Sequence, residues 1–238
     1  MPFASMGREN GKRCPVRSFL LITDVFCPWC YGFAPVMRRL LASYGFPVRV
    51  LCGNLVDEPM QSAVMGDPKG LAFFRRLVET TGRPVGDGLY NILRKENSIL
   101  MDSTKAAILL RALKKLAPGA ALEQMEAFQD AFYAEGHDVL SADVQTAVAA
   151  RWGVDAHALA EAMASPSVAA DAQKDMDEAE EILGDFVVYP TLYVRDDSGT
   201  LHAVARGYAP YETVVEKIDA ALSSGQEAAV SANACGPD

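Results

Sequence analysis

The sequence predicts an α/β fold in which a βαβ unit, a large helical block and a ββα unit follow one another along the chain. Two apolar runs, 19–22 and 46–51, flank a segment with helical periodicity. The next strand pattern begins only at residue 186, after a long and mostly helical stretch. Two short strand patterns and a last amphipathic helix then close the fold. A compact α/β fold of this kind needs only one helix between its second and third strands, so the block is an insertion.

This order predicts how the chain is divided. We expect a flexible N-terminal arm, an α/β domain built from two separate segments, an inserted helical subdomain whose last helix returns to that domain, and a disordered tail. The respective residues are 1–16, then 17–58 with 185–223, then 59–184, and finally 224–238.

Composition limits the possible partners and the compartment. The 238 residues are 50% hydrophobic and 22% charged, which is enough to bury a substantial core. A formal charge of −9 argues against nucleic acid or an anionic membrane as the main partner. No apolar run is long enough to insert into a membrane, and 19–22 is too short for a signal sequence. With an odd number of cysteines, five, we expect a cytoplasmic protein of unknown oligomeric state.

The first βαβ unit is well marked. The strand at 18–24 is almost continuously apolar, which predicts burial on both faces of a sheet. Pro28 suits the first helical position, and helical spacing of apolar residues continues to Tyr44. Gly45 ends the helix, and the second strand follows at 46–51.

Helices in the central block are predicted mainly from their ends. Asp67 and Pro68 open one helix, which ends near Gly82. Ser103 is the predicted cap of the next. The others run through Met125, Phe128 and Phe132, from Ser141 to Gly153, from Asp155 to Ala164 and from Ser165 to Gly184. We interpret the acidic residues of the last helix, Asp175 among them, as a solvated face.

The C-terminal unit is predicted as a β-hairpin followed by a helix. Its strands are expected at 186–195 and 201–206, separated by a turn at 196–199. The helix is expected at 210–222, from the apolar spacing of Val214 and Ile218.

The candidate site is the sequence Cys27-Pro28-Trp29-Cys30 at the junction of the first strand and first helix. With Pro28 at the first helical position, Cys27 is the N-cap. A thiolate there would face unpaired N–H groups and the positive end of the helix dipole, which lower a thiol pKa. Cys30, one turn later, can attack a mixed disulfide on Cys27.

Two other interpretations of the cysteine pair are a zinc half-site and a purely structural disulfide. A zinc site needs further ligands at short spacing. The other cysteines and all histidines are scattered singly through the chain, at Cys14, Cys52, Cys235, His137, His157 and His202. We expect no metal site, and a structural disulfide is improbable in a reducing compartment. Cys52 is expected to be a small buried residue, while Cys14 and Cys235 receive no role.

The second half of the site is predicted at Tyr189-Pro190-Thr191. A proline inside a strand pattern is unusual unless its peptide bond is cis or the strand lies at an edge, and both alternatives remain open.

Together these features resemble the DsbA-like branch of the thioredoxin superfamily. The resemblance rests on the Cys27–Cys30 motif after a first strand, on the helical insertion and on Val188-Tyr189-Pro190-Thr191-Leu192 before a hairpin. Asp24-x-x-Cys27-x-x-Cys30-Tyr31-Gly32 and Met101-Asp102-Ser103-Thr104 are most similar to the cytoplasmic FrnE-like, protein-disulfide isomerase-like group. The resemblance covers nearly all of the chain from Phe19 to Leu222.

The resemblance implies a thioredoxin-like fold in which cis-Pro190 packs against the cysteine pair. It also implies that the backbone of Tyr189 pairs with an extended substrate and that Pro28 and Trp29 contribute to the adjoining surface. Proteins of this fold often bury an acid six residues before the nucleophile, where this chain has Leu21. Asp24 is the nearest carboxylate in sequence, and it either assists proton transfer or only ends the strand.

The main hypothesis is a thiol–disulfide oxidoreductase, a reductase or isomerase of protein or small-molecule disulfides. It needs no metal or organic cofactor, and glutathione is a possible electron donor. A second hypothesis is a redox-sensitive protein adaptor. A third, a kappa-type glutathione-dependent transferase, is disfavoured because those proteins typically carry a Ser or a single Cys at the nucleophile position.

Overall fold

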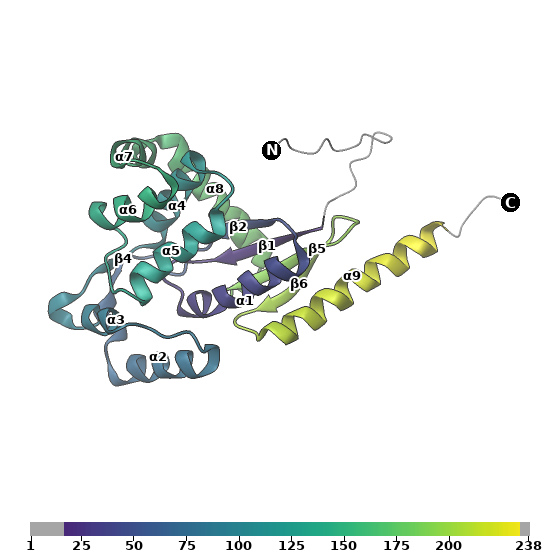
Figure 1. Cartoon of the computed structure of the whole chain (residues 1–238), viewed down its shortest axis with the longest axis horizontal. Helices are drawn as coiled ribbons and strands as arrows, with labels where there is room; N and C mark the ends of the chain where they lie inside the picture. Colours follow the sequence, from purple (N-terminus) through teal and green to yellow (C-terminus); the bar gives the residue numbers. More distant parts are fainter. Residues whose placement is uncertain (1–16, 234–238) are drawn as a thin grey trace.

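The computed structural model describes residues 17–233, in which a four-stranded mixed sheet is surrounded by helices (Figure 1). The strand order is β2-β1-β5-β6. β1 (Ser18–Thr23) is parallel to β2 (Val48–Cys52) and antiparallel to β5 (Thr191–Arg195), and β5 is antiparallel to β6 (Leu201–Arg206). The predicted α/β fold with a βαβ unit and a C-terminal hairpin is confirmed.

β1 is buried on both faces, as its apolar run predicts. Successive side chains of a strand point to opposite faces. Phe19 and Leu21 lie in the large core that includes residues of α1 (Pro28–Tyr44) and of the helical block. Leu20 and Ile22 lie in a smaller core with residues of α8 (Pro166–Leu183). The sheet is therefore enclosed between α8 on one face and the remaining core on the other.

The helical block is the part of the chain that connects β2 to β5. It forms the small antiparallel pair of β3 (Met60–Gln61) and β4 (Leu100–Met101) and most of the helices seen at the left of Figure 1. Besides α8 the helices are α2 (Pro68–Thr81), α3 (Asp87–Ile92), α4 (Ser103–Leu116), α5 (Ala121–Tyr133), α6 (Ala142–Ala149) and α7 (Ala156–Ala164), with the 3-10 turns η1 (Ser62–Met65), η2 (Lys95–Asn97) and η3 (Ala150–Trp152).

Most of the predicted caps are confirmed. The side chains of Asp67, Ser141 and Asp155 accept hydrogen bonds from the first turns of α2, α6 and α7. One is wrong, because α4 is capped by Asp102, which accepts from the backbone N–H of Lys105 at 2.9 Å. Ser103 is the first helical residue instead, and its hydroxyl accepts from the N–H of Val56 at 3.0 Å.

The strand predicted at 186–195 is shorter in the structure. β5 begins at Thr191, opposite Ile22 of β1, and the five preceding residues lie outside the sheet. Gly184 has a φ of +62°, which turns the chain sharply at the end of α8. Phe186 and Val187 are 63% and 50% exposed, so the apolar character that predicted a strand belongs to a surface segment.

The C-terminal helix is longer than expected. α9 continues from Tyr211 to Asn233, through residues that we expected to form a disordered tail. Alanine is frequent in this stretch and favours helix, whereas the small, polar character of the residues suggested disorder. In Figure 1 the second half of α9 extends beyond the sheet. The predicted arm at 1–16 and the positions 234–238, with Cys14 and Cys235, lie outside the described residues.

Asp175 is not part of a solvated face. It is buried where α8 packs against α4 and β2, and the ammonium of Lys114 and the guanidinium of Arg111 lie 3.4 and 3.3 Å from its Oδ2. Lys114 also donates to the carbonyl oxygen of Val50 at 2.9 Å. An acid on the inner side of α8 is thus neutralised by cations that the sequence pattern of α8 could not reveal.

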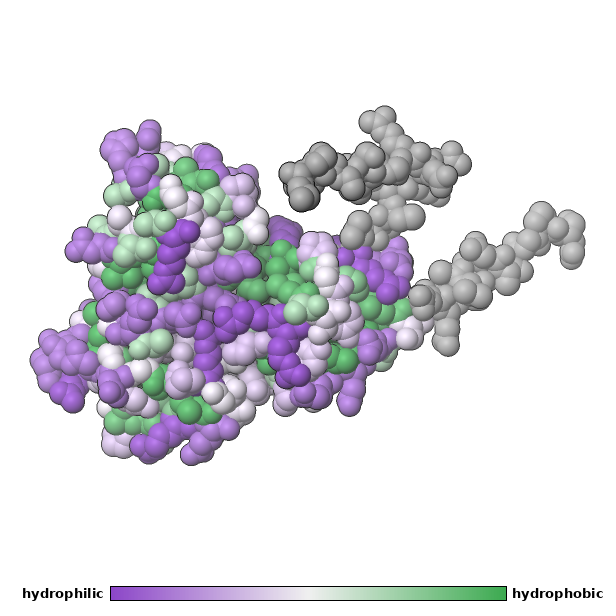
Figure 2. Space-filling view, in the orientation of Figure 1, coloured by the Kyte–Doolittle hydropathy of each residue, from purple (hydrophilic) through white to green (hydrophobic). Residues whose placement is uncertain are grey.

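The outer surface is mostly polar. In Figure 2 hydrophilic residues cover much of the face viewed, and hydrophobic residues appear in separate areas between them. Within 17–233 no helix combines the length and apolarity that crossing a membrane requires.

Candidate active site

Cys27 lies at the N-terminus of α1, where the sequence predicts it. Its backbone is extended, with φ −88° and ψ 112°, and its Sγ accepts a hydrogen bond from the N–H of Cys30 at 3.3 Å. Pro28 occupies the first helical turn. Because β1 ends at Thr23 and α1 begins four residues after Asp24, the strand-to-helix turn carries Cys27 to the carboxyl end of the central strand.

The predicted second half of the site lies directly beside this sulfur. The thiol of Cys27 donates to the carbonyl oxygen of Tyr189, with Sγ and O 3.6 Å apart. The peptide bond between Tyr189 and Pro190 is cis. The carbonyl of Pro190 accepts from the N–H of Gly207 at 2.7 Å, and the Thr191 hydroxyl donates to the carbonyl of Val188 at 2.7 Å. The loop is therefore tied to the residue that follows β6 and to the first residue of β5.

Tyr189 is also anchored through its ring. Its hydroxyl accepts from the N–H of Asn54 at 3.2 Å, just beyond the end of β2. The ring lies so close to Gly53 that a Cβ there would be 2.2 Å from ring carbon Cε1. The absence of a side chain at Gly53 allows the ring to occupy this place.

Both cysteines of the motif are free thiols, and each is only 3% exposed. Burial raises the pKa of the Cys30 thiol well above its ordinary value, and the adjacent Cys27 sulfur raises it further. The hydroxyl of Thr23 and the backbone of Asp24 act in the opposite direction. Since the two cysteines are equally buried, it is their position on α1 that distinguishes them. With its raised pKa, the Cys30 thiol needs a nearby proton acceptor to become a thiolate.

Trp29 and Pro28 are half-buried beside the pair. The Trp29 ring packs edge-to-face on Phe73 of α2, with centroids 5.6 Å apart, and lies 6.1 Å from the ring of Tyr208 before α9. An aromatic platform from three separate elements thus adjoins the cysteines. The role of Trp29 in binding substrate stays a prediction.

Asp24 is fully buried and bonded to backbone. Its Oδ1 accepts from the N–H of Phe26 at 2.8 Å, and its Oδ2 accepts from the N–H of Leu55 at 3.1 Å. Burial raises the pKa of this carboxyl, while these bonds and the Ser103 hydroxyl lower it. The carboxylate ties the strand-to-helix turn to the segment after β2. Its role in proton transfer stays a prediction.

A polar face of α5 was not predicted from the sequence. Glu126, Gln129 and Tyr133 follow one another at intervals of three and four, which places them on one side of a helix. Gln129 donates to the backbone carbonyl of Asp24 at 3.0 Å. Glu126 and Gln129 also line a small internal cavity whose wall includes Cys30. Its volume is about 10 Å³, close to what one water molecule requires.

Glu126 is buried but bonded at only one oxygen. Its Oε2 lies 3.0 Å from a guanidinium nitrogen of Arg38. Within residues 17–233, neither its Oε1 nor the hydroxyl of Tyr133 has a hydrogen-bond partner. Burial raises the pKa of Glu126 to about 7, and Arg38 limits the rise. No sequence signal predicts this burial, because polar residues also flank the apolar stripe of a solvent-exposed amphipathic helix, as Gln124 and Glu126 flank Met125.

The other described cysteine and the candidate metal ligands lie apart from this chemistry. Cys52 ends β2 as a buried residue, as expected, and burial raises its pKa to about 12. Across 17–233 no group of three or more His, Cys, Asp or Glu side chains is placed to hold a metal ion.

Comparison with known families and proteins gives a consistent result. The family model described as a DSBA-like thioredoxin domain matches residues 21–218. Among curated proteins, the ClpXP adapter protein SpxH of Halalkalibacterium halodurans is 23% identical over 222 residues, which cover 89% of this chain and 69% of that protein.

Two solved structures are similar over most of their length. One is a protein from Nitrosomonas europaea that has been assigned as a protein disulfide isomerase, with a TM-score of 0.74, 22% identity and coverage of 88% of this chain and 99% of that chain. The other is the cytosolic disulfide reductase DsbM from Pseudomonas aeruginosa with GSH, with a TM-score of 0.63, 23% identity and coverage of 78% and 88%. At these identities the likeness shows the fold alone.

Proposed function

Because this chain belongs to the DSBA-like thioredoxin domain family, we propose that it is a thiol–disulfide oxidoreductase that reduces or isomerises disulfides of proteins or small molecules. The observation that carries the proposal is the placement of the Cys27 sulfur. It caps α1, receives the N–H of Cys30 at 3.3 Å and lies 3.6 Å from the Tyr189 carbonyl. A thiolate at such a helix N-terminus is stabilised by backbone N–H groups and by the dipole.

In the proposed reaction, the Cys27 thiolate attacks one sulfur of a substrate disulfide. A bond forms between Cys27 and that sulfur, and the other substrate sulfur leaves as a thiolate. Cys30 then attacks Cys27, which releases the second substrate thiolate and leaves a Cys27–Cys30 disulfide. The substrate gains the two electrons that the dithiol loses. Isomerisation follows if the released thiolate attacks the mixed disulfide first.

We propose that substrate binds across the loop at Tyr189. Its carbonyl points at the reactive sulfur and can accept an N–H from an extended segment, which would align a disulfide with Cys27. Pro28, Trp29 and Pro190 would form the adjoining apolar wall. Phe186 and Val187, a few residues before Pro190, are exposed apolar side chains that could add to it.

Disulfide exchange passes electrons from sulfur to sulfur, so we propose no resident cofactor. Glutathione is our candidate electron donor, and the cytoplasm is the proposed compartment. Support comes from the Pseudomonas aeruginosa neighbour, a cytosolic disulfide reductase whose structure includes GSH.

The test combines a potential with two variants. Equilibration with glutathione should give a reversible two-electron couple for the wild type, and insulin reduction should be lost in Cys27→Ser. Cys30→Ser should still react once and accumulate a mixed disulfide on Cys27. If the pair fails to cycle, or if Cys27→Ser retains activity, the oxidoreductase proposal is wrong.

A protein adaptor is the second candidate. It is favoured by the SpxH relative, which is a ClpXP adapter protein, and by a surface pocket of about 970 Å³ on the helical block. Val64, 59% exposed, lines this pocket, which contains neither cysteine of the site. Binding to purified ClpXP that is retained without both cysteines and lost in Val64→Asp would support the adaptor. No binding by the wild type would exclude a ClpXP adaptor.

A further inference from the structure

We infer that Glu126 of α5 exchanges a proton with the Cys30 thiol through a water in the cavity that both residues line. The inference rests on the proposed function and deepens it by assigning the group that makes Cys30 a nucleophile. It also places part of the redox machinery in the inserted helices rather than in the α/β domain.

The cavity connects the two groups. Its wall is formed by Cys30 of α1, Glu126 and Gln129 of α5, Thr23 at the end of β1, and Pro190 of the cis loop, together with apolar side chains. Its volume of about 10 Å³ is at the lower limit for one water, for which Cys30, Thr23, Glu126 and Gln129 are the polar partners. Such a water would link the buried sulfur of Cys30 to α5.

The carboxyl of Glu126 is free to receive that proton. One oxygen, Oε2, is held by Arg38 from the solvent side, and Oε1 has no partner in the described part of the chain. A buried acceptor without a partner is costly, and most such atoms in proteins are bonded. Asp24, by contrast, uses both carboxylate oxygens to hold backbone N–H groups, so its lone pairs are largely occupied.

The charges around Glu126 come from several elements. Arg38 of α1 and Arg83, between α2 and α3, favour the ionised carboxyl, whereas Glu123 and Asp130 on α5 itself oppose it. Burial outweighs the cations and sets the pKa near 7. Such a group is both an acceptor and a donor at neutral pH, which suits a proton relay.

In the mixed disulfide between Cys27 and the substrate, ionised Glu126 takes the proton of Cys30 through the water. The Cys30 thiolate then forms a bond to the sulfur of Cys27, the bond from Cys27 to the substrate sulfur breaks, and substrate leaves as a thiolate that is protonated by solvent. In the reverse direction, protonated Glu126 returns the proton to Cys30 as it leaves.

A chromogenic aromatic disulfide, which releases one coloured thiolate at each exchange, separates the two steps in a stopped-flow experiment. The first phase reports attack by Cys27 and the second reports resolution by Cys30. In wild type we expect the second phase to accelerate as pH rises through about 7. In Glu126→Gln the first phase should stay within about twofold, while the second should slow at least about 10-fold at pH 8, with its rise moved to higher pH.

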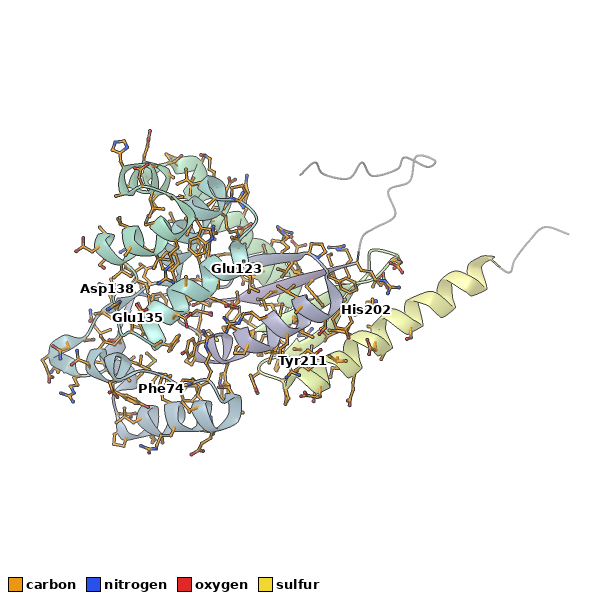
Figure 3. All side chains as sticks on the ribbon, viewed as in Figure 1. Phe74, Glu123, Glu135, Asp138, His202 and Tyr211 are labelled. Atoms are coloured by element: carbon orange, nitrogen blue, oxygen red, sulfur yellow. The ribbon has the colours of Figure 1, made fainter. Side chains whose placement is uncertain are left out.

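The matched control is Glu135→Gln, which removes the same charge from an exposed position just after α5, labelled in Figure 3, where the carboxylate pairs with His137. Its second phase should match the wild type. Thermal unfolding at pH 6 identifies any loss of structure in either variant. If Glu126→Gln keeps the wild-type second phase with a midpoint near 7, the inference is overturned.

A second variant tests the electrostatics without touching the acid. Arg38 is 56% exposed, so Arg38→Gln should leave the fold intact and remove a cation that favours ionised Glu126. The midpoint of the second phase should move to higher pH. Arg39→Gln, whose guanidinium instead pairs with Glu212 of α9, should not move it. An unchanged midpoint in Arg38→Gln contradicts the inference.

The two phases also separate this inference from the proposed function. If the wild type releases no coloured thiolate, or if Cys27→Ser releases it equally fast, the oxidoreductase proposal fails and the inference fails with it. If the wild type shows both phases and only the dependence on Glu126 is missing, the proposed function stands and the inference alone is wrong.

Discussion

The cysteine pair lies between two walls, one on the sheet side and one formed by α5. They differ in whether the hydrogen bonds of their polar groups are satisfied. On the sheet side, both carboxylate oxygens of Asp24 accept hydrogen bonds from backbone N–H groups. The carbonyls of the cis-proline loop likewise accept hydrogen bonds from Gly207 and Thr191. On the helical side, Glu126 and Tyr133 each keep an unpaired oxygen among the described residues. Polar groups whose hydrogen bonds are satisfied hold the local backbone in place, whereas groups with an unpaired oxygen can still exchange protons. The difference separates the wall that positions sulfur from the wall that serves its chemistry.

The largest effect should come from removing the saturated acid. Asp24→Ala leaves the buried N–H of Phe26 without a partner, at a cost of about 1–3 kcal/mol, and also removes the hydrogen bond to the N–H of the more exposed Leu55. We expect the free energy of unfolding in urea to fall by about 2–4 kcal/mol. Glu126→Gln should lower it by less than about 1 kcal/mol at pH 6. Equal losses would erase the contrast between the walls.

The next effect concerns the anchor of the sheet-side loop. In Gly53→Ala the new methyl group would lie 2.2 Å from the Tyr189 ring, so the ring must leave the place where it anchors the loop whose carbonyl lies beside Cys27. We expect a stability loss of about 1–3 kcal/mol and a reduced first-phase rate with aromatic disulfide. Gly45→Ala is a useful comparison, because its φ of +64° strains an alanine although nothing lies near its Cβ position, so it should lose stability without slowing the first phase. A normal first phase in Gly53→Ala would show that loop position does not govern Cys27.

A smaller effect is expected from pH. Because the pKa of Glu126 is about 7 in the folded protein and 4.5 ordinarily, the folded state holds this proton more tightly. The resulting stability is present below pH 4.5 and is lost as pH rises to about 7, by at most about 3 kcal/mol. Urea unfolding at several pH values should show that loss in wild type and a flatter profile in Glu126→Gln. A parallel pH profile in the two proteins would show that Glu126 ionises normally.

The smallest effect is expected away from both walls. Asp175→Asn weakens the cluster with Arg111 and Lys114 but leaves those cations near Asp171 and the Val50 carbonyl. A loss of about 1 kcal/mol in unfolding free energy is therefore expected. Both kinetic phases should be unchanged. Slower exchange in Asp175→Asn would mean that the site depends on the far face of the sheet.

Local signals were sufficient for most of the fold. The apolar run before Asp24, the proline after Cys27 and the glycine at position 45 place the first strand and helix where the structure has them. Where two suitable residues are adjacent, as with Asp102 and Ser103, the choice of cap depends on a contact with Val56 far along the chain.

The helical wall could not be predicted for a related reason. Spacing of Met125, Phe128 and Phe132 shows one buried face of α5, but ten of its thirteen residues are buried in the structure. The second buried face exists only because α1 and α4 both pack against this helix. Sequence periodicity reports the helix, and tertiary packing decides that Glu126 points inward. The same holds for Asp175, whose partners come from β2 and α4.

Lys114 at the edge of the sheet has a consequence for association. β2 is an edge strand, and an exposed edge invites another extended chain to add to it. The ammonium group of Lys114 already donates a hydrogen bond to the Val50 carbonyl, and Arg49 of the same strand is a second cation at this edge. Charge on this edge disfavours the addition of another strand there. Under the proposed function, pairing with an extended substrate is then left to the loop beside the reactive sulfur.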